Sequence, residues 1–194
     1  MRIPMLVVVV LMLRAVPAGA QITDLERQRL IAHLEMTGSW LEDEVSALAA
    51  DQVNFRPSEN AWTILEVLDH LVVVGEIYWQ DLQGATPVGS GRAGMMTDAD
   101  VLWYGIDRTN RETALRTEEP SRKVRDVTTG MAEFRRHHTR LIEYVRTTRD
   151  DLRHRIVKRQ NSDAYQWAML ISTHEQRHIL QIREIKSHAK FPKR

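Results

Sequence analysis

Four stretches of the chain carry apolar residues at the alternating three- and four-residue spacing of an amphipathic α-helix, and this pattern limits the fold more than any other feature. It predicts helices over about 24–50, 63–83, 128–148 and 163–188. A helix with one apolar stripe needs partners that cover the stripe, and the sequence shows no strand-type alternation of any length. The pattern therefore predicts an all-α fold in which the four helices pack as a four-helix bundle.

Local signals mark where these helices begin. Thr23 with Glu26, and Thr63 with Glu66, have the spacing of capping boxes, in which each side chain binds the other residue's backbone N–H. Residues 161–163 (Asn-Ser-Asp) offer an N-cap to the last helix. These signals agree with the helix starts that the apolar spacing predicts.

The connection between the second and third helices, residues 84–127, is unusually long for a compact domain. Glycines and a proline make its first part irregular, and Thr97 with Asp100 predicts a short helix over about 97–104. A connection of this length is typical of a crossover or of a lid over a pocket. Trp103 and Tyr104 are candidates for lining such a pocket or for anchoring the segment to the core.

Composition limits the range of functions. The chain has 194 residues, of which 43% are apolar, and this is enough for one domain with a sizeable core. Its 27 basic and 26 acidic residues form no long basic block, so the sequence gives no support for nucleic-acid binding. Cysteine is absent, which excludes a thiol nucleophile, a thiolate zinc site and an iron–sulfur cluster. Any metal would have to be held by histidine and carboxylate.

Residues 1–20 differ from the rest and have the pattern of a secretory signal peptide. Arg2 precedes an apolar run over residues 3–13, and residues 18–20 (Ala-Gly-Ala) match the small-residue cleavage site. The run is too short for a typical membrane span. We expect cleavage after Ala20, leaving a secreted or periplasmic domain of residues 21–194 that is not attached to a membrane. The alternative is an uncleaved N-terminal anchor.

Histidines lie on three of the predicted apolar stripes. His174 and His178 are one helical turn apart, so both rings can reach one point, and His70 lies on the inward stripe of the 63–83 helix. Burying three imidazoles without partners would be costly, whereas one divalent metal would satisfy them all. His138 lies on the stripe of the 128–148 helix and is either a pocket residue or a core-edge residue. The remaining histidines are expected to be solvated: His33, His137, His154 and His188.

Residues 174–178 also spell H-E-x-x-H, the signature of zinc proteases, in which Glu175 would be the general base. Two observations count against this interpretation. The longer metzincin pattern needs Gly and His where this chain has Gln181 and Glu184, and only 16 residues follow His178 to supply a distant third ligand. We expect Glu175 to be a solvated residue beside the site.

Residues 62–71 (WTILEVLDHL) and 174–182 (HEQRHILQI) resemble the two motifs of the DinB-like (DinB/YfiT-like) proteins, and the resemblance covers about 23–188. It implies a four-helix bundle with up-up-down-down connectivity and a long crossover between helices 2 and 3. It also implies a divalent metal, zinc or nickel, held by His70, His174 and His178. By the same resemblance Gln181 would stand behind the ligands, and Glu66 and His138 are further candidates beside the site.

The resemblance implies metal-dependent chemistry on a small-molecule substrate, because characterised relatives transfer or isomerise low-molecular-weight thiol compounds. Family members often dimerise, so the resemblance makes a homodimer possible and leaves the oligomeric state open. An exported protein meets little of those cytoplasmic thiols, so other functions stay open: a non-catalytic metal- or ligand-binding bundle, and the HExxH zinc hydrolase. A fourth ligand from Glu66 or His138 would favour the non-catalytic role, and an open coordination position would favour chemistry.

Overall fold

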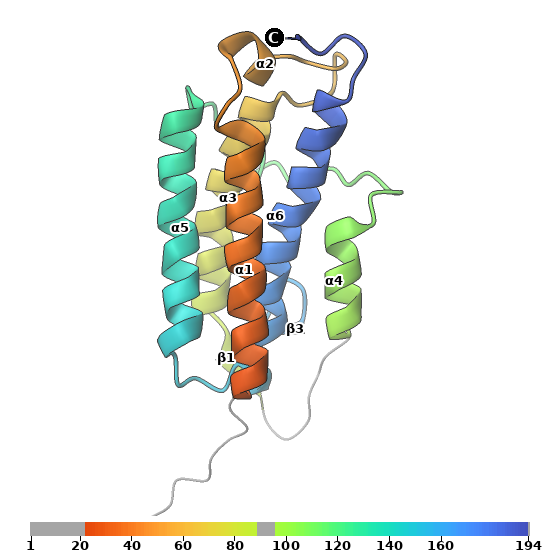
Figure 1. Cartoon of the computed structure of the whole chain (residues 1–194). Helices are drawn as coiled ribbons and strands as arrows, with labels where there is room; N and C mark the ends of the chain where they lie inside the picture. The colour runs from red at the N-terminus through yellow and green to blue at the C-terminus, as the bar shows by residue number, and fades with distance from the viewer. Residues whose placement is uncertain (1–21, 89–95, 194) are drawn as a thin grey trace, which may run out of the picture.

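Four long helices form the body of the computed structural model, which describes residues 22–88 and 96–193 (Figure 1). They are α1 (Asp24–Val45), α3 (Ile64–Gln83), α5 (Val127–Thr147) and α6 (Ala164–Lys186). The predicted four-helix bundle is thereby confirmed. The predicted signal peptide lies outside the described residues. Within these residues no helix is both long enough and apolar enough to cross a membrane.

The order of the helices around the bundle differs from their order along the chain. Both α1 and α3 pack against α5 and α6, so α1 and α3 lie on opposite corners. In Figure 1, α1 and α6 run upward while α3 and α5 run downward. Taken around the bundle in the order α1, α6, α3, α5, the helices therefore run up-up-down-down, the arrangement that the resemblance implied. Taken along the chain, they run up-down-down-up. Helices α3 and α5 are parallel because the long connection after α3 returns the chain to the end of the bundle where α3 began.

The capping boxes predicted from sequence are present. Thr23 accepts from the Glu26 backbone and Thr63 from the Glu66 backbone, and each glutamate binds back to the capping residue's N–H. Helix α1 ends at Val45, earlier than predicted, and a turn separates it from the one-turn helix α2 (Ala50–Val53). Packing of α2 against α3 outweighs the local helix propensity of the intervening residues.

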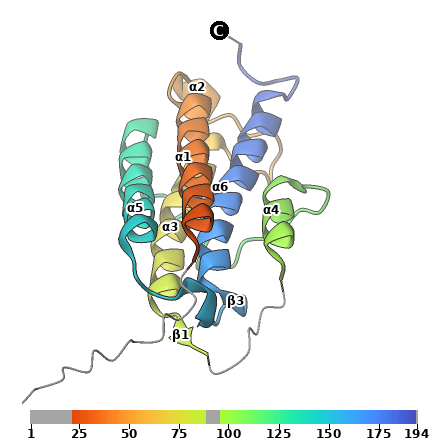
Figure 2. The same cartoon turned by 60° about the horizontal axis from the view of Figure 1, so that its bottom comes forward.

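A small three-stranded antiparallel sheet, which no sequence pattern predicts, closes one end of the bundle (Figure 2). It consists of β1 (Thr86–Pro87), β2 (Arg155–Val157) and β3 (Ser162–Asp163), with the short 3₁₀ helix η1 (Leu152–His154) before β2. Strands of two or three residues are too short to show a period of two, so periodicity alone could not reveal them.

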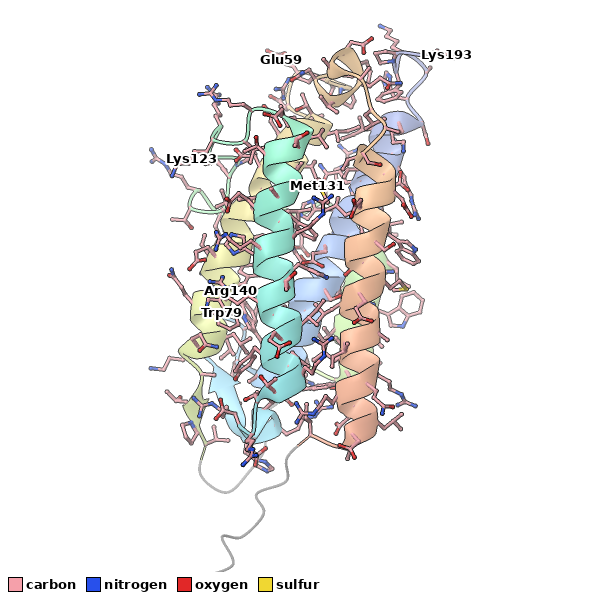
Figure 3. The ribbon with its side chains drawn as sticks, turned by 60° about the vertical axis from the view of Figure 1, so that its left-hand side comes forward. Glu59, Trp79, Lys123, Met131, Arg140 and Lys193 are labelled. Atoms are coloured by element: carbon pink, nitrogen blue, oxygen red, sulfur yellow. The ribbon has the colours of Figure 1, made fainter. Side chains whose placement is uncertain are left out.

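The parallel helices α3 and α5 are in close contact. A Cβ atom on Gly130 would lie 2.6 Å from Leu68 Cδ2, so only glycine fits at this position without a shift. On the outer face of the pair, the Arg140 guanidinium lies 4.4 Å from the centroid of the Trp79 ring (Figure 3). The same guanidinium binds Glu76 at 2.9 Å. These contacts fix the register of α5 against α3.

The predicted short helix is α4 (Asp98–Ile106), and it covers the side of α6 that the bundle leaves open (Figure 1). At its start, Arg153 binds Asp98 together with Glu26 of α1, which joins three segments. At its end, Gly105 lies so close to α6 that a Cβ atom would be 2.9 Å from Thr173 Cβ. Because α6 is covered on all sides, 17 of its 23 residues are buried.

Two clusters of buried apolar side chains fill the bundle. One lies toward the sheet and includes Leu34 and Trp167, and the other lies toward α2 and includes Leu68 and Ile179. Between them α6 carries the run 172–178, in which most residues are both polar and buried. Burying polar groups in the middle of a bundle is unfavourable unless each has a partner, so this layer is the candidate for a functional site.

Candidate metal centre

Three imidazoles meet in the polar layer where α3 passes α6. The Nε2 atom of His174 lies 3.4 Å from Nε2 of His70 and 3.2 Å from Nε2 of His178. One ring nitrogen from each residue lies within 4.8 Å of the others, and in the described part of the chain no carboxylate or further imidazole joins this group. The structure thus brings together the three residues that the sequence singled out.

The outer nitrogens of two rings face hydrogen-bond acceptors. His70 Nδ1 lies 2.5 Å from the Glu118 carbonyl oxygen, and His178 Nδ1 lies 2.8 Å from Oε1 of Gln181. Each Nδ1 therefore carries the proton and each Nε2 presents a lone pair toward the centre. A proton on His174 Nε2 could satisfy only one of these lone pairs. A shared cation satisfies all three, and acceptors behind the rings are the usual support of metal-binding histidines.

Burial favours the neutral form of all three rings. It lowers the pKa of His70, and it lowers the pKa of His174 and His178 well below the ordinary histidine value, with the neighbouring imidazoles adding to the shift. Neutral imidazole is the form that binds a metal, so these side chains need not lose a proton on binding at neutral pH.

The spacing of the nitrogens fits a zinc-sized ion. A tetrahedral site with Zn–N bonds of 2.0–2.1 Å places its nitrogens about 3.3 Å apart, and the two Nε2 separations here are 3.4 and 3.2 Å. Imidazole nitrogens suit zinc and nickel, whereas calcium and magnesium prefer oxygen. The donor set therefore fits a divalent transition metal.

The three imidazoles lie in the wall of an open cleft with a volume of about 820 Å³. The turn over residues 56–62 forms one side, and residues 108–122 of the crossover, together with the end of α6, form the other. Glu66 also lines the cleft, but its carboxylate binds Arg56 at 2.6 Å and the Thr63 backbone at 2.8 Å. Those bonds hold Glu66 outside the group of converging ligand atoms.

Aromatic rings surround the imidazoles. The centroid of the Trp62 ring lies 4.9 Å from that of His70, while Tyr78 and Tyr104 lie 5.4 and 6.5 Å from His174. Tyr104 lines the cleft, which is one of the two roles considered for it from the sequence. Trp103 does neither of the things expected of it, because it is 64% exposed on the outer face of α4.

Two charged residues beside the histidines position the crossover, and neither was predicted from the sequence. The buried Asp69 carboxylate accepts from the Ser121 hydroxyl at 3.0 Å and from the backbone N–H groups of Arg122 and Val124. Arg177 donates to three backbone carbonyls at the end of α4 and in the following loop: Tyr104, Asp107 and Asn110. A buried charge on an inward stripe was the available signal, since such a charge needs partners.

Glu175 is buried, which corrects the prediction that it is solvated. It is 6% exposed, and its carboxylate accepts from the Thr37 hydroxyl at 2.9 Å and lies 3.2 Å from His138 Nδ1. His138 in turn contacts the Leu34 carbonyl through Nε2 at 2.8 Å and is not part of the cleft. One residue along a helix is a rotation of about 100°, so Glu175 faces α1 and α5 while His174 faces the cleft. Glu175 is not placed to act as an HExxH base.

Two other histidines are also less solvated than predicted. His137 is 8% exposed beside Arg136 and Arg140, and His33 is half-buried with its Nδ1 2.7 Å from the Ser172 hydroxyl. The long arginine side chains cover His137, and the contact with α6 covers His33. Neither lies in the cleft.

Comparison with known proteins agrees with this geometry. The sequence model of the DinB superfamily matches residues 24–182. The fold is similar to that of YfiT from Bacillus subtilis, described as a probable metal-dependent hydrolase with an unusual four-helix bundle topology. That similarity has a TM-score of 0.55 at 16% identity and covers 89% of this chain and 93% of YfiT. A search of curated proteins found no match. The chain belongs to the DinB superfamily.

Proposed function

We propose that the protein is a metal-dependent hydrolase of small molecules, with zinc or nickel held by His70, His174 and His178. One observation carries the proposal: three neutral imidazoles bring their Nε2 atoms together in the wall of an open cleft, and no fourth side chain among the described residues closes the group. Three protein ligands and an open position are typical of catalytic zinc, whereas structural zinc has four protein ligands.

The metal, when bound, lowers the pKa of a coordinated water or thiol and polarises a substrate oxygen. The residues of this chain do the rest. Gln181 and the Glu118 carbonyl fix the orientation of two imidazoles, and Asp69 and Arg177 hold the crossover beside them. The rings of Trp62 and the two tyrosines form walls that limit the size of what can approach.

Thiol-dependent transfer is the second candidate, because it needs the same open position with a thiol in place of water. Export favours hydrolysis over transfer, since we also propose that residues 1–20 direct the chain out of the cytoplasm. A purely structural metal is less well supported, because Glu66 and His138 are both engaged elsewhere.

The test is a comparison of metal-free, zinc-loaded and nickel-loaded protein on a panel of chromogenic carboxylic and phosphoric esters. Hydrolysis that is lost with chelator and restored by metal supports the proposal. A parallel assay supplies a small thiol and an electrophilic dye. Metal-dependent consumption of the dye without ester hydrolysis would favour transfer, and stoichiometric metal binding without either activity would favour the non-catalytic role.

A further inference from the structure

We propose that the hydroxyl of Tyr78 donates a hydrogen bond to an oxygen atom of the substrate in the cleft beside the three imidazoles. The inference rests on the proposed function and narrows its substrate class to compounds whose reacting oxygen carries or develops negative charge, such as acyl and phosphoryl compounds. Three features of Tyr78 support this assignment: the residue is buried, its hydroxyl has no partner in the protein, and its ring is held in a fixed position.

Tyr78 differs from the other tyrosines of the chain in having no hydrogen-bond partner for its hydroxyl. The hydroxyls of Tyr104, Tyr144 and Tyr165 contact Glu112, Asp150 and the Glu26 carbonyl, respectively. Within the described part of the chain, no group is placed to bond Tyr78 Oη.

The Tyr78 residue is nevertheless only 8% exposed. Its hydroxyl is not among the fully enclosed polar atoms that lack a partner, and the residue lines the cleft, so the hydroxyl opens onto the cleft. A phenylalanine would pack equally well at this place without a polar group to satisfy. A hydroxyl that opens onto the cleft is free to donate to an oxygen acceptor that binds there in place of water.

The ring of Tyr78 is held in place before any ligand binds. Its centroid lies 5.1 Å from that of Trp167 and 5.4 Å from that of His174. The indole N–H of Trp167 donates to the Tyr78 carbonyl at 2.9 Å, which fixes the backbone as well. A donor that is fixed in advance loses little entropy when a ligand binds. Donors held in place in this way stabilise developing negative charge in enzyme sites.

The surroundings of Tyr78 keep its hydroxyl protonated. Burial raises the pKa of Tyr78, and the carboxylates of Glu118 and Asp81 add to that shift. Arg159 lies 5.7 Å from the ring centroid, binds both carboxylates and acts against the shift. Elsewhere in the wall of the cleft, the buried guanidinium of Arg177 supplies a positive charge, and it donates to backbone carbonyls. A phenol that keeps its proton can donate a hydrogen bond to an oxygen atom of a ligand in the cleft.

The experiment compares wild type, Tyr78→Phe and Tyr144→Phe, each loaded with Co²⁺, whose visible absorption reports changes at the metal. Two probes are titrated: inorganic phosphate, which offers oxygen acceptors, and imidazole, whose one acceptor nitrogen is used by the metal. Tyr144 is the control because it lies on α5 outside the cleft, and its hydroxyl contacts only residues near it in the chain, Thr148 and Asp150. Metal content is measured for all three proteins.

We expect Tyr78→Phe to weaken phosphate binding about tenfold or more, as for loss of a hydrogen bond to a charged group, while imidazole binding and Co²⁺ content stay unchanged. Tyr144→Phe should leave all three unchanged. Equal phosphate affinity in wild type and Tyr78→Phe overturns the inference and leaves the metal site intact, as does a Co²⁺-loaded wild type that binds imidazole but not phosphate. A wild type that takes up no metal overturns the proposed function itself, and the inference with it.

Discussion

Two faces of α6 carry buried polar side chains at the same height in the bundle, but their hydrogen bonds are completed differently. On the face toward α1 and α5, Glu175 binds Thr37 and His138, and Ser172 binds Thr37 and His33. On the face toward the cleft, the Nε2 atoms of three histidines point at one another. The first network is complete within the protein, whereas the second leaves nitrogen lone pairs that a cation would satisfy. The residues on both faces are buried and polar. A structural layer differs from a binding site in whether each donor and acceptor has a partner within the protein.

The largest expected effect is on the cleft face. His174→Ala removes the nitrogen that lies between the other two, and we expect the affinity for zinc to fall by more than about a hundredfold, because loss of a partner behind a ligand alone costs 10–100-fold. The metal-free protein should stay folded, because a proton on that Nε2 can serve at most one hydrogen bond, to another imidazole of the same group. Metal titration by mass spectrometry and the far-UV spectrum measure the two outcomes.

His154→Ala is the matched control for this substitution, since His154 is exposed and lies outside the cleft. Equal metal content in His174→Ala, His154→Ala and wild type would contradict the assignment of His174 as a ligand.

The second-largest effect is expected on the face toward α1 and α5, where a substitution should lower stability and leave metal binding unchanged. Glu175→Ala leaves the Thr37 hydroxyl and His138 without their buried partner, and we expect the free energy of unfolding to fall by about 3 kcal/mol. Metal content and any turnover per folded molecule should be retained. Urea unfolding of the metal-free protein measures the first, and metal analysis the second.

Glu175→Gln is the conservative control for the second substitution, because an amide oxygen can still accept from Thr37, and its stability should lie between those of wild type and Glu175→Ala. If turnover disappeared in the glutamine variant while stability was unchanged, the HExxH interpretation would have to be reinstated.

The same contrast shows how far the sequence could predict the site. Two sequence features were enough to predict that the three rings meet: the spacing of His174 and His178, and the place of His70 on an apolar stripe. The prediction for Glu175 was wrong because it assumed that α6 has one buried side. Thr37 of α1 and His138 of α5 bury the side of α6 that carries Glu175, and local patterns do not determine which helices cover which side.

Long-range backbone partners limited the prediction in the same way. The carboxylate of Asp69 binds N–H groups of Arg122 and Val124, more than fifty residues away, and His70 is oriented by a backbone carbonyl of the same segment. No residue type reveals a backbone partner, so the sequence predicted which three histidines meet but not what holds them in place. The direction of α5 was likewise set by the crossover rather than by any local signal.

The smallest expected effect is the pH dependence of the complete network. Burial acts to lower the pKa of His138, but the Glu175 carboxylate and the Leu34 carbonyl outweigh it, so the pKa is raised above the ordinary value of 6.5. Both ring nitrogens face acceptors, which requires the doubly protonated ring. A raised folded-state pKa adds stability that is fully present below the unfolded-state value and is lost as the pH rises through the folded-state value.

The metal-free protein should therefore be more stable than His138→Gln by a margin that is largest below about pH 6.5 and shrinks as the pH rises above it. Urea unfolding of both proteins at a series of pH values measures this margin, and the absence of metal removes any contribution from metal release. A margin that grew with rising pH would mean that His138 is buried as the neutral ring. The network on that face would then also lack a proton, and the contrast between the two faces of α6 would fail.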